Sequence, residues 1–323
     1  MKSVPEVTCV GEVLVDFIPS KSGVTLNDAP AFHKALGGEA ANVAVGLAKL
    51  GTRTGFVGSV GDEPFGRFLA SELAKAKVDT TGIIFHKECQ TRLAFVSLTR
   101  SGDRDFTFWE SHPAGEQLHV SDLDLEAILK SKIVNIGPLM LVRNPSRSTA
   151  IWLAQQARRH GCDVAFDPNL RLSLWPLPIE AKRVSLRMIR LSTLVRLNAD
   201  EARFFTGRRD LEKAADDLLS IGPAVAIITL GSKGCYFQTK RASAFVRGFK
   251  IKALDTTGCG DGFLAGILHR IIKTNESVRK LPTDALASIC RYANAVGALT
   301  ALRPGGAAAT PTYREVDRFL SKA

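Results

Sequence analysis

A short apolar run, a turn and an amphipathic helical pattern follow one another repeatedly along this chain. Apolar residues recur at helical spacing, as at Val43, Leu47 and Leu50, or form short continuous runs typical of buried strands. The runs predict strands at residues 7–15, 54–60, 133–136, 164–166, 194–197 and 225–229. The helical patterns predict helices within residues 37–50, 65–76, 148–160, 210–220, 263–272, 285–301 and 313–320. This alternation indicates an α/β fold, with a doubly wound, mostly parallel central sheet and helices on both faces.

Two segments depart from this alternation. Residues 20–36 hold no clear helix, and residues 91–109 alternate like strands around a turn at residues 101–103. We expect them to pair into a small β lid made of residues 17–36 and 89–116. The α/β core would then comprise residues 1–16, 37–88 and 117–323. An ordinary edge hairpin is the simpler alternative.

Polar or flexible residues follow several predicted strands directly. They are Asp16, Asp167, Asn198 and Gly231. In parallel sheets ligands bind beyond the carboxyl ends of the strands, so these positions are expected to share one rim.

Composition narrows the class of protein further. The chain has 323 residues, 45% apolar and 23% charged, with no apolar run long enough for a membrane span. Six cysteines without a CxxC pair indicate reduced thiols, and the acidic residues near the N-terminus argue against a signal peptide, so we expect the cytoplasm. The net charge of +11 suits either a nucleic-acid binder or attraction of an anionic substrate. Without a nucleic-acid motif or a dense basic run, the second reading is favoured.

The stretch DTTGCGDGFLAG, residues 255–266, places a glycine turn at the start of a predicted helix. Amides at a helix N-terminus lack intrahelical partners and attract anions, so Gly258, Cys259 and Gly260 suit a phosphoryl group. Asp261 lies in the first turn, where the helix dipole favours its charge, and can take a proton from an attacking hydroxyl. The simpler alternative is a favourable helix-start charge.

A second glycine turn lies in LGGEAANVAVGLAKLG, residues 36–51. Gly37 and Gly38 allow the backbone to approach a ligand, and Asn42 offers an amide donor and acceptor. Together with Asp16 they suit a polyhydroxylated ligand. Asn42 is alternatively a common helix-start residue.

These two stretches, in this order, resemble the two signatures of the ribokinase-like (PfkB) carbohydrate kinases. The resemblance extends over essentially the whole chain and is closest to fructokinases. The segments FDPNLRLSLW, RLNADEARFFTG, TLGSKGCYF and ALTALRPGGAAATPT are similar to fructokinase segments at residues 166–175, 196–207, 229–237 and 298–312.

The resemblance implies a role for each matching position. Asp261 matches the catalytic base, with Gly258, Cys259 and Gly260 as the anion hole. The sugar would be held by Asp16, Gly37, Gly38, Asn42 and Arg171. The nucleotide side would comprise Asn198, Glu201, Thr229, Gly231, Gly234 and Asn294, with Glu201 holding magnesium through water. A potassium loop, found in some members, would comprise Asp255, Thr257, Thr300, Arg303 and Gly305.

Several positions depart from the family pattern. Cys259 replaces a small residue, and Glu39 with Ala40 replaces the Ala-Pro usual in fructokinases. Glu110 and Gly115 replace an arginine and an aspartate of the lid, which weakens the assignment of fructose. Ala309 stands where ribokinases place a hydroxyl, which weakens the expectation of potassium.

Together these features predict a kinase that uses ATP and Mg²⁺ to phosphorylate a primary hydroxyl, with fructose as the leading substrate. The alternatives are a 2-keto-3-deoxygluconate, ribose or nucleoside kinase, for which Arg171 would serve a keto-acid carboxylate, or an inactive fructokinase-like binding protein. We expect no nucleic-acid or membrane partner, and a monomer or a homodimer through the lid.

Overall fold

The computed structural model describes residues 4–21, 23–98, 104–109 and 111–322. Nine strands of this part form one sheet in the order β13-β12-β11-β10-β9-β8-β1-β4-β5. From β11 to β5 in this order, each strand runs parallel to the next. Strand β12 pairs antiparallel with both β11 and β13. The strands are β1 (Val7–Val10), β4 (Thr54–Gly61), β5 (Asp79–His86), β8 (Ile133–Ile136), β9 (Asp163–Phe166), β10 (Leu194–Asn198), β11 (Val225–Thr229), β12 (Gly234–Thr239) and β13 (Ser243–Arg247).

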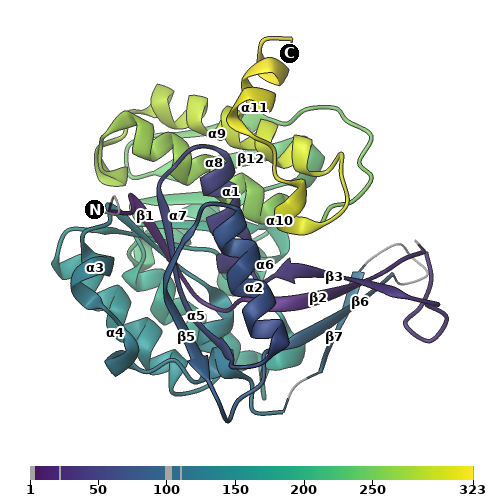
Figure 1. Ribbon diagram of the computed structural model, residues 1–323. Helices are drawn as coiled ribbons and strands as arrows, with labels where there is room; N and C mark the ends of the chain where they lie inside the picture. The colour runs from purple at the N-terminus through teal and green to yellow at the C-terminus, as the bar shows by residue number, and fades with distance from the viewer. Residues whose placement is uncertain (1–3, 22, 99–103, 110, 323) are drawn as a thin grey trace.

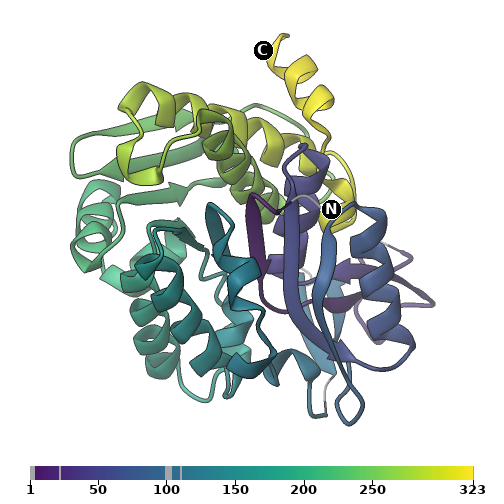
Figure 2. The same cartoon turned by 60° about the vertical axis from the view of Figure 1, so that its left-hand side comes forward.

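Helices cover both faces of this main sheet (Figures 1 and 2). One apolar cluster joins the sheet to α1 (Glu39–Lys49), α2 (Pro64–Lys75), α8 (Cys259–Thr274), α9 (Thr283–Thr300), α10 (Gly306–Ala309) and α11 (Tyr313–Leu320). The other cluster joins it to α3 (Leu125–Leu129), α4 (Ser146–Arg159), α5 (Pro178–Leu191), α6 (Ala199–Thr206) and α7 (Leu211–Ile221). Strand residues alternate between the clusters: Ile227 faces the first and Ile228 the second. The doubly wound α/β fold is therefore confirmed.

A small second sheet projects from the main body, on the right of Figure 1. Its order is β3-β2-β6-β7, from β2 (Leu14–Pro19), β3 (Phe32–Gly37), β6 (Leu93–Leu98) and β7 (Arg104–Trp109). The expected second sheet is therefore present, although the turn at residues 101–103 and Glu110 lie outside the described residues. Strand β2 crosses the expected boundary between residues 16 and 17, and the division into core and lid stays a prediction.

The expected single strand over residues 7–15 was wrong. The chain leaves the main sheet after β1 and enters the small sheet at β2. Gly11 lies at the bend, where a Cβ would stand 2.6 Å from the Ala40 Cβ. Glu12 is buried there and pairs with the Arg92 guanidinium at 2.5 Å. Asp16 consequently lies within the small sheet.

Among the described residues, none of the helices combines the length and the apolar character that crossing a membrane requires.

Candidate active site

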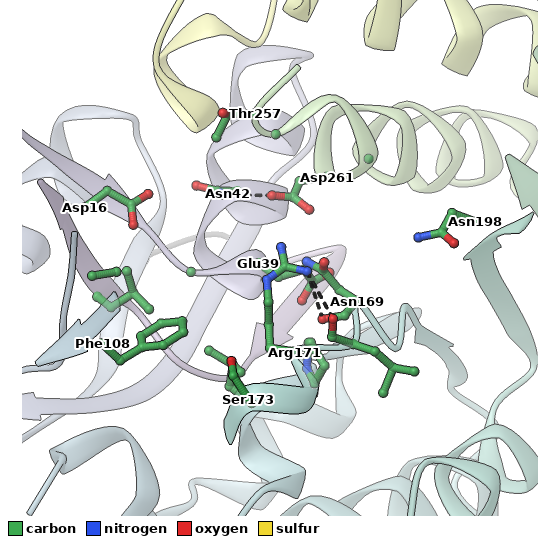
Figure 3. Close-up of a pocket in the computed structure, with 18 of the residues that line it drawn as sticks. Asp16, Glu39, Asn42, Phe108, Asn169, Arg171, Ser173, Asn198, Thr257 and Asp261 are labelled. Carbon is green, nitrogen blue, oxygen red and sulfur yellow. Dashed lines mark hydrogen bonds between the residues drawn. The ribbon is translucent and has the colours of Figure 1, made fainter. Parts of the chain in front are cut away.

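A pocket of about 560 Å³ opens between the main sheet and the small sheet. Figure 3 shows Asp16 and Asp261 on opposite sides of it, with Arg171 between and below them. The pocket joins nine of the residues expected from the sequence: Asp16, Gly38, Asn42, Arg171, Asn198, Thr257, Gly258, Gly260 and Asp261. The N-terminal polar cluster and the late glycine turn therefore face one cavity.

Asp261 lies in the first turn of α8 and is bound by a side chain of α1. The Asn42 Nδ2 donates a hydrogen bond to the Asp261 Oδ2 at 2.7 Å. Burial, with a smaller contribution from the charge of Asp167, raises the pKa of Asp261 to about 6 against the opposing effects of Asn42, Arg196 and Arg171. A carboxyl with this pKa is mostly ionised at neutral pH and close enough to it to act as a general base.

The turn before Asp261 can be made only by glycine at its first position. Gly258 has a φ of 72°, and a Cβ on it would stand 2.9 Å from the Gly306 Cα. Gly258 and Gly260 line the pocket. The Cys259 amide instead donates to the Thr256 carbonyl at 3.3 Å, so the expected third donor points back into the turn.

The glycine pair beside α1 gives Asp16 its place. Asp16 lies in β2 opposite Ala35 of β3, and a Cβ on Gly37 would stand 2.4 Å from the Asp16 Oδ2. Gly38 has a φ of 97° and passes so close to the Glu12 carbonyl that a Cβ would lie 2.5 Å from it. Position 38 therefore requires glycine, whereas a side chain at position 37 would have to displace the Asp16 carboxylate.

Glu201 does not line the pocket, but it binds the backbone of two residues that do, Leu170 and Asn198. Its carboxylate accepts hydrogen bonds from the Leu170 amide at 2.8 Å and from the Asn198 amide at 2.9 Å. The Asn198 Oδ1 accepts from the Glu201 amide in return, which completes a capping box at the start of α6. This network fixes the loop that carries Arg171, and leaves Asn198 facing the cavity.

The sequence reasoning missed Arg196, which reaches the pocket from β10. Its guanidinium forms an ion pair with the Asp167 Oδ2 at 2.6 Å and donates to the Thr229 Oγ1 at 2.6 Å. A Cβ on Gly260 would stand 2.7 Å from the Arg196 Nη1, so this positive charge lies directly below the glycine turn. An arginine inside the apolar run 194–197 was the available signal.

Glu39 was noticed only as a departure from the family pattern, yet it lines the floor of the pocket (Figure 3). It is 6% exposed, and in the described part of the chain neither carboxyl oxygen has a hydrogen-bond partner. Burial raises the pKa of Glu39 well above its usual range, and the charges of Asp261 and Asp167 raise it further. Burial therefore shifts both neighbouring carboxyls, Glu39 and Asp261, toward their neutral forms.

Of the six residues expected on the nucleotide side, only Asn198 lines this pocket; Glu201, Thr229, Gly231, Gly234 and Asn294 do not. Thr229 ends β11, Gly231 begins the next turn, and Gly234 begins β12 with a φ of 112°. Asn294 lies on α9 and donates to the carbonyls of Val246 and Arg247, both at 3.2 Å.

The residues expected around potassium lie on neighbouring loops. The Asp255 carboxylate accepts from the Thr257 amide at 2.7 Å and from the Gly305 amide at 3.2 Å. The Thr257 Oγ1 is buried without a partner among the described residues. The Arg303 side chain pairs with Glu315, and the Thr300 hydroxyl donates to the Val296 carbonyl at 2.8 Å.

Two lid departures were expected to face the sugar. Gly115 is buried, and a Cβ on it would stand 2.7 Å from the Glu12 Cγ, so it packs on the base of β2 and does not line the pocket. The lid residues that line it are Ala94 of β6 and Phe108 of β7. Glu110 falls in a gap between the described ranges.

Comparisons with known proteins agree with this arrangement. Residues 4–313 match the model of the pfkB family carbohydrate kinases. The chain is 39% identical over 321 residues to the probable chloroplastic fructokinase-6 of Arabidopsis thaliana, covering 99% of this chain and 83% of that protein.

Two solved structures share the fold along their whole length. The fructokinase of Xylella fastidiosa with bound ATP has a TM-score of 0.90 at 26% identity, with 99% of each chain covered. A fructokinase double mutant of Vibrio cholerae O395, with fructose, ADP and potassium ion bound, has a TM-score of 0.88 at 30% identity. That comparison covers 99% of this chain and 100% of the other.

Proposed function

The chain belongs to the pfkB family of carbohydrate kinases, and we propose that it transfers the terminal phosphoryl group of ATP to a primary hydroxyl of fructose. The observation that carries the proposal is the shared pocket, in which Asp16 and the Asn42–Asp261 pair face the same space. The product is fructose 6-phosphate.

In this proposal Asp261 accepts the proton of the attacking hydroxyl. The sugar oxygen forms a bond to the terminal phosphorus, the bond from that phosphorus to the bridging oxygen breaks, and ADP leaves. The reaction needs Asp261 ionised, and a pKa of about 6 supports this at neutral pH. Burial favours the neutral form of Glu39 beside it, which would keep a second negative charge away from the incoming phosphates.

The sugar and the transferring group would be held from different elements. Asp16 of β2 and Asn42 of α1 supply acceptors and donors for sugar hydroxyls, beside the backbone of Gly37 and Gly38. The amides of Gly258 and Gly260 meet the developing phosphoryl charge. The Cys259 amide joins them once its 3.3 Å bond to Thr256 opens. Arg196, directly beneath, adds positive charge.

The nucleotide would extend from Asn198 toward Thr229, Gly231, Gly234 and Asn294. The donor set fits magnesium bound mainly through water, because the described residues contain no cluster of three or more carboxylate, histidine or cysteine ligands. Glu201 would reach the ion through water, since both of its oxygens accept backbone hydrogen bonds. Bound magnesium would neutralise charge on the ATP phosphates.

A monovalent cation site is a separate part of the proposal. Asp255, Thr257, Thr300, Arg303 and Gly305 would form it, and the unpartnered Thr257 hydroxyl supports an additional ligand there. Replacing potassium chloride by choline chloride in the assay should lower turnover if the site is used. Equal rates in both salts would remove it.

The decisive experiment is a substrate panel with ATP, run beside Asp261→Asn. Fructose should have the highest kcat/KM, and Asp261→Asn should lower kcat by about 10²-fold or more while fructose binding persists. Preference for 2-keto-3-deoxygluconate would instead assign Arg171, which lines the pocket, to a substrate carboxylate. No turnover with any sugar would leave the inactive binding protein.

Location and assembly complete the proposal. We expect a cytoplasmic protein, since the described cysteines are free thiols, although one relative is chloroplastic by name. Imaging of a tagged protein would test this.

A monomer, or a homodimer through the small sheet, is expected, and Trp109 on β7 is 72% exposed. Sedimentation of the wild type and Trp109→Ser distinguishes the two.

A further inference from the structure

A second cavity, of about 730 Å³, lies between α4 and α5. These two helices pack side by side at the lower left of Figure 1. The cavity shares no lining residue with the pocket that contains Asp261. We call it the arginine groove, after its lining residues Arg147, Arg183, Arg187 and Arg190; Trp152 and Gln155 also line it.

The arginine groove carries an uncompensated positive charge. Its lining contains four arginines and no aspartate or glutamate. Arg147 pairs with Glu180 outside the lining at 2.7 Å. In the part of the chain that the structure describes, Arg183, Arg187 and Arg190 take part in no ion pair with a carboxylate. Three guanidinium groups along one cavity therefore raise the local concentration of anions.

The spacing of the arginines defines the kind of anion. Arg183, Arg187 and Arg190 follow one another at intervals of four and three residues on α5, so they share one helix face. At about 1.5 Å per residue they extend over roughly 10 Å, more than a single phosphate reaches. Arginine binds phosphate oxygens through two parallel hydrogen bonds.

We propose that the arginine groove binds a small ligand with two or more phosphate groups. Its volume falls in the range of small-molecule sites, about 300–1,000 Å³. Trp152 of α4 offers a partly buried ring and Gln155 an amide, both suited to the uncharged part of such a ligand. A nucleic acid is disfavoured, because the lining is confined to a space between two helices and contains one aromatic residue.

Arg147 connects the arginine groove to the walls of the substrate pocket. Its Nε donates to the Leu141 carbonyl at 2.7 Å, in the turn whose earlier residues Pro138 and Leu139 line that pocket. Its guanidinium carbon also lies 5.5 Å from the centre of the Trp175 ring. Trp175 directly follows the loop that carries Arg171 and Ser173, two residues that line the substrate pocket. A phosphate that binds Arg147 would weaken its contacts with Leu141 and Trp175 and so shift the two pocket-lining segments beside them. We therefore infer that the ligand regulates sugar binding.

Calorimetric titration of the full-length protein with tripolyphosphate, without sugar, tests the site. Arg183→Gln/Arg187→Gln should raise the dissociation constant of tripolyphosphate by about tenfold or more, because each charge-assisted hydrogen bond to phosphate that is lost weakens binding. The matched control is Arg314→Gln/Arg318→Gln, an exposed pair four residues apart on α11, with the same loss of charge. Unchanged binding in the control and unchanged circular dichroism in both variants are expected. Equal weakening in both variants, or in neither, would overturn the site.

Three further titrations distinguish the source of the ligand. ADP and fructose 1,6-bisphosphate are each compared with tripolyphosphate, in the wild type and in Arg183→Gln/Arg187→Gln. Tighter binding of ADP that depends on these two arginines identifies a nucleotide as the ligand, and tighter binding of fructose 1,6-bisphosphate identifies a sugar phosphate. Duplex RNA that binds more tightly than all three, through the same arginines, would overturn the small-molecule proposal. Residual binding in Arg183→Gln/Arg187→Gln measures the substrate pocket.

The regulatory step has its own readout. Tripolyphosphate should change the fructose dissociation constant of the wild type by several-fold, and sugar should change tripolyphosphate affinity by the same factor. Arg183→Gln/Arg187→Gln should lose this change and keep its basal kcat and KM. Coupling that persists in that variant would place regulation elsewhere. If fructose is not the substrate, the binding result still stands, because it needs no sugar.

Discussion

Replacing Arg196 by methionine should destabilise the protein far more than most surface substitutions. Arg196 pairs with Asp167 at 2.6 Å, and Asp167 is fully buried at the end of β9. Methionine has a similar length and keeps the apolar packing, but it leaves the Asp167 carboxylate without its counter-charge. Its remaining hydrogen bond is from the Asn169 amide at 3.0 Å. Breaking a buried pair in this way costs about 3–5 kcal/mol.

Urea unfolding gives the free energy, and a double-mutant cycle tests its cause. Asp167→Asn/Arg196→Met removes both charges, so it should recover a large part of the loss seen in Arg196→Met. The Arg196 charge also lowers the pKa of Asp261, so the acid limb of kcat/KM should move to higher pH in Arg196→Met. A single variant as stable as the wild type, or a double variant no better than the single, would refute the account.

Four further outcomes are expected. The kcat/KM of the wild type should fall about tenfold per pH unit below pH 6, because Asp261, with a pKa of about 6, must be ionised; an acid limb near pH 4 would contradict its burial. Gly37→Ala should raise the fructose KM about tenfold and leave the ATP KM unchanged, because the added Cβ would stand 2.4 Å from the Asp16 Oδ2. A larger change in the ATP KM than in the fructose KM would contradict this reasoning. Glu39→Gln should keep kcat/KM within about threefold, since an amide replaces a protonated carboxyl of the same shape, whereas a large loss would show that Glu39 works ionised. Burial lowers the pKa of His269 to about 4, so the unfolded chain binds the extra proton and stability is lost as pH falls from 6.5 towards 4, by at most about 1.4 kcal/mol per unit. His269→Gln lacks this contribution, so the difference in unfolding free energy between wild type and variant should show this slope, and the opposite contribution of Asp261 cancels in that difference; a difference that does not change with pH would contradict the burial of His269.

The regular part of the fold could be predicted because its strands are buried on both faces. The apolar runs at β8 and β11 gave the observed bounds, Ile133–Ile136 and Val225–Thr229. The path after β1 could not be predicted, because one apolar run continues through two sheets. Only the contacts of Gly11 with Ala40, and of Glu12 with Arg92, show where the chain turns.

Strands β12 and β13 were also missed. The residues of β13 alternate between exposed and half-buried, so its sequence has no continuous apolar run. Its place depends on antiparallel pairing with β12, in which Tyr236 lies opposite Phe245. Such pairing of an edge strand with its neighbour leaves a weak signal in the sequence.

The candidate site shows a similar limit. Short motifs identified Asp261, Asn42 and the glycine turns because their chemistry is local. Arg196 and Glu39 lie within the quoted segments but match none of the roles that the resemblance implies, and each depends on neighbours from distant segments. Arg196 meets Asp167 from the adjacent strand, and Glu39 is surrounded by Asp261, Asp167 and Asn135. Their importance follows from three-dimensional proximity.

The two carboxyls beside the glycine turn show why residue type alone does not assign the base. Glu39 and Asp261 are both buried acids in the first turn of a helix, α1 and α8 respectively. The Asn42 amide and the positive charges of Arg196 and Arg171 lower the pKa of Asp261, whereas burial and the charges of Asp261 and Asp167 raise the pKa of Glu39 well above its usual range. Burial and the neighbouring carboxylates favour the neutral form of Glu39, while Asp261, with a pKa of about 6, is mostly ionised at neutral pH and can accept a proton. The environment, more than the motif, supports Asp261 as the proposed base.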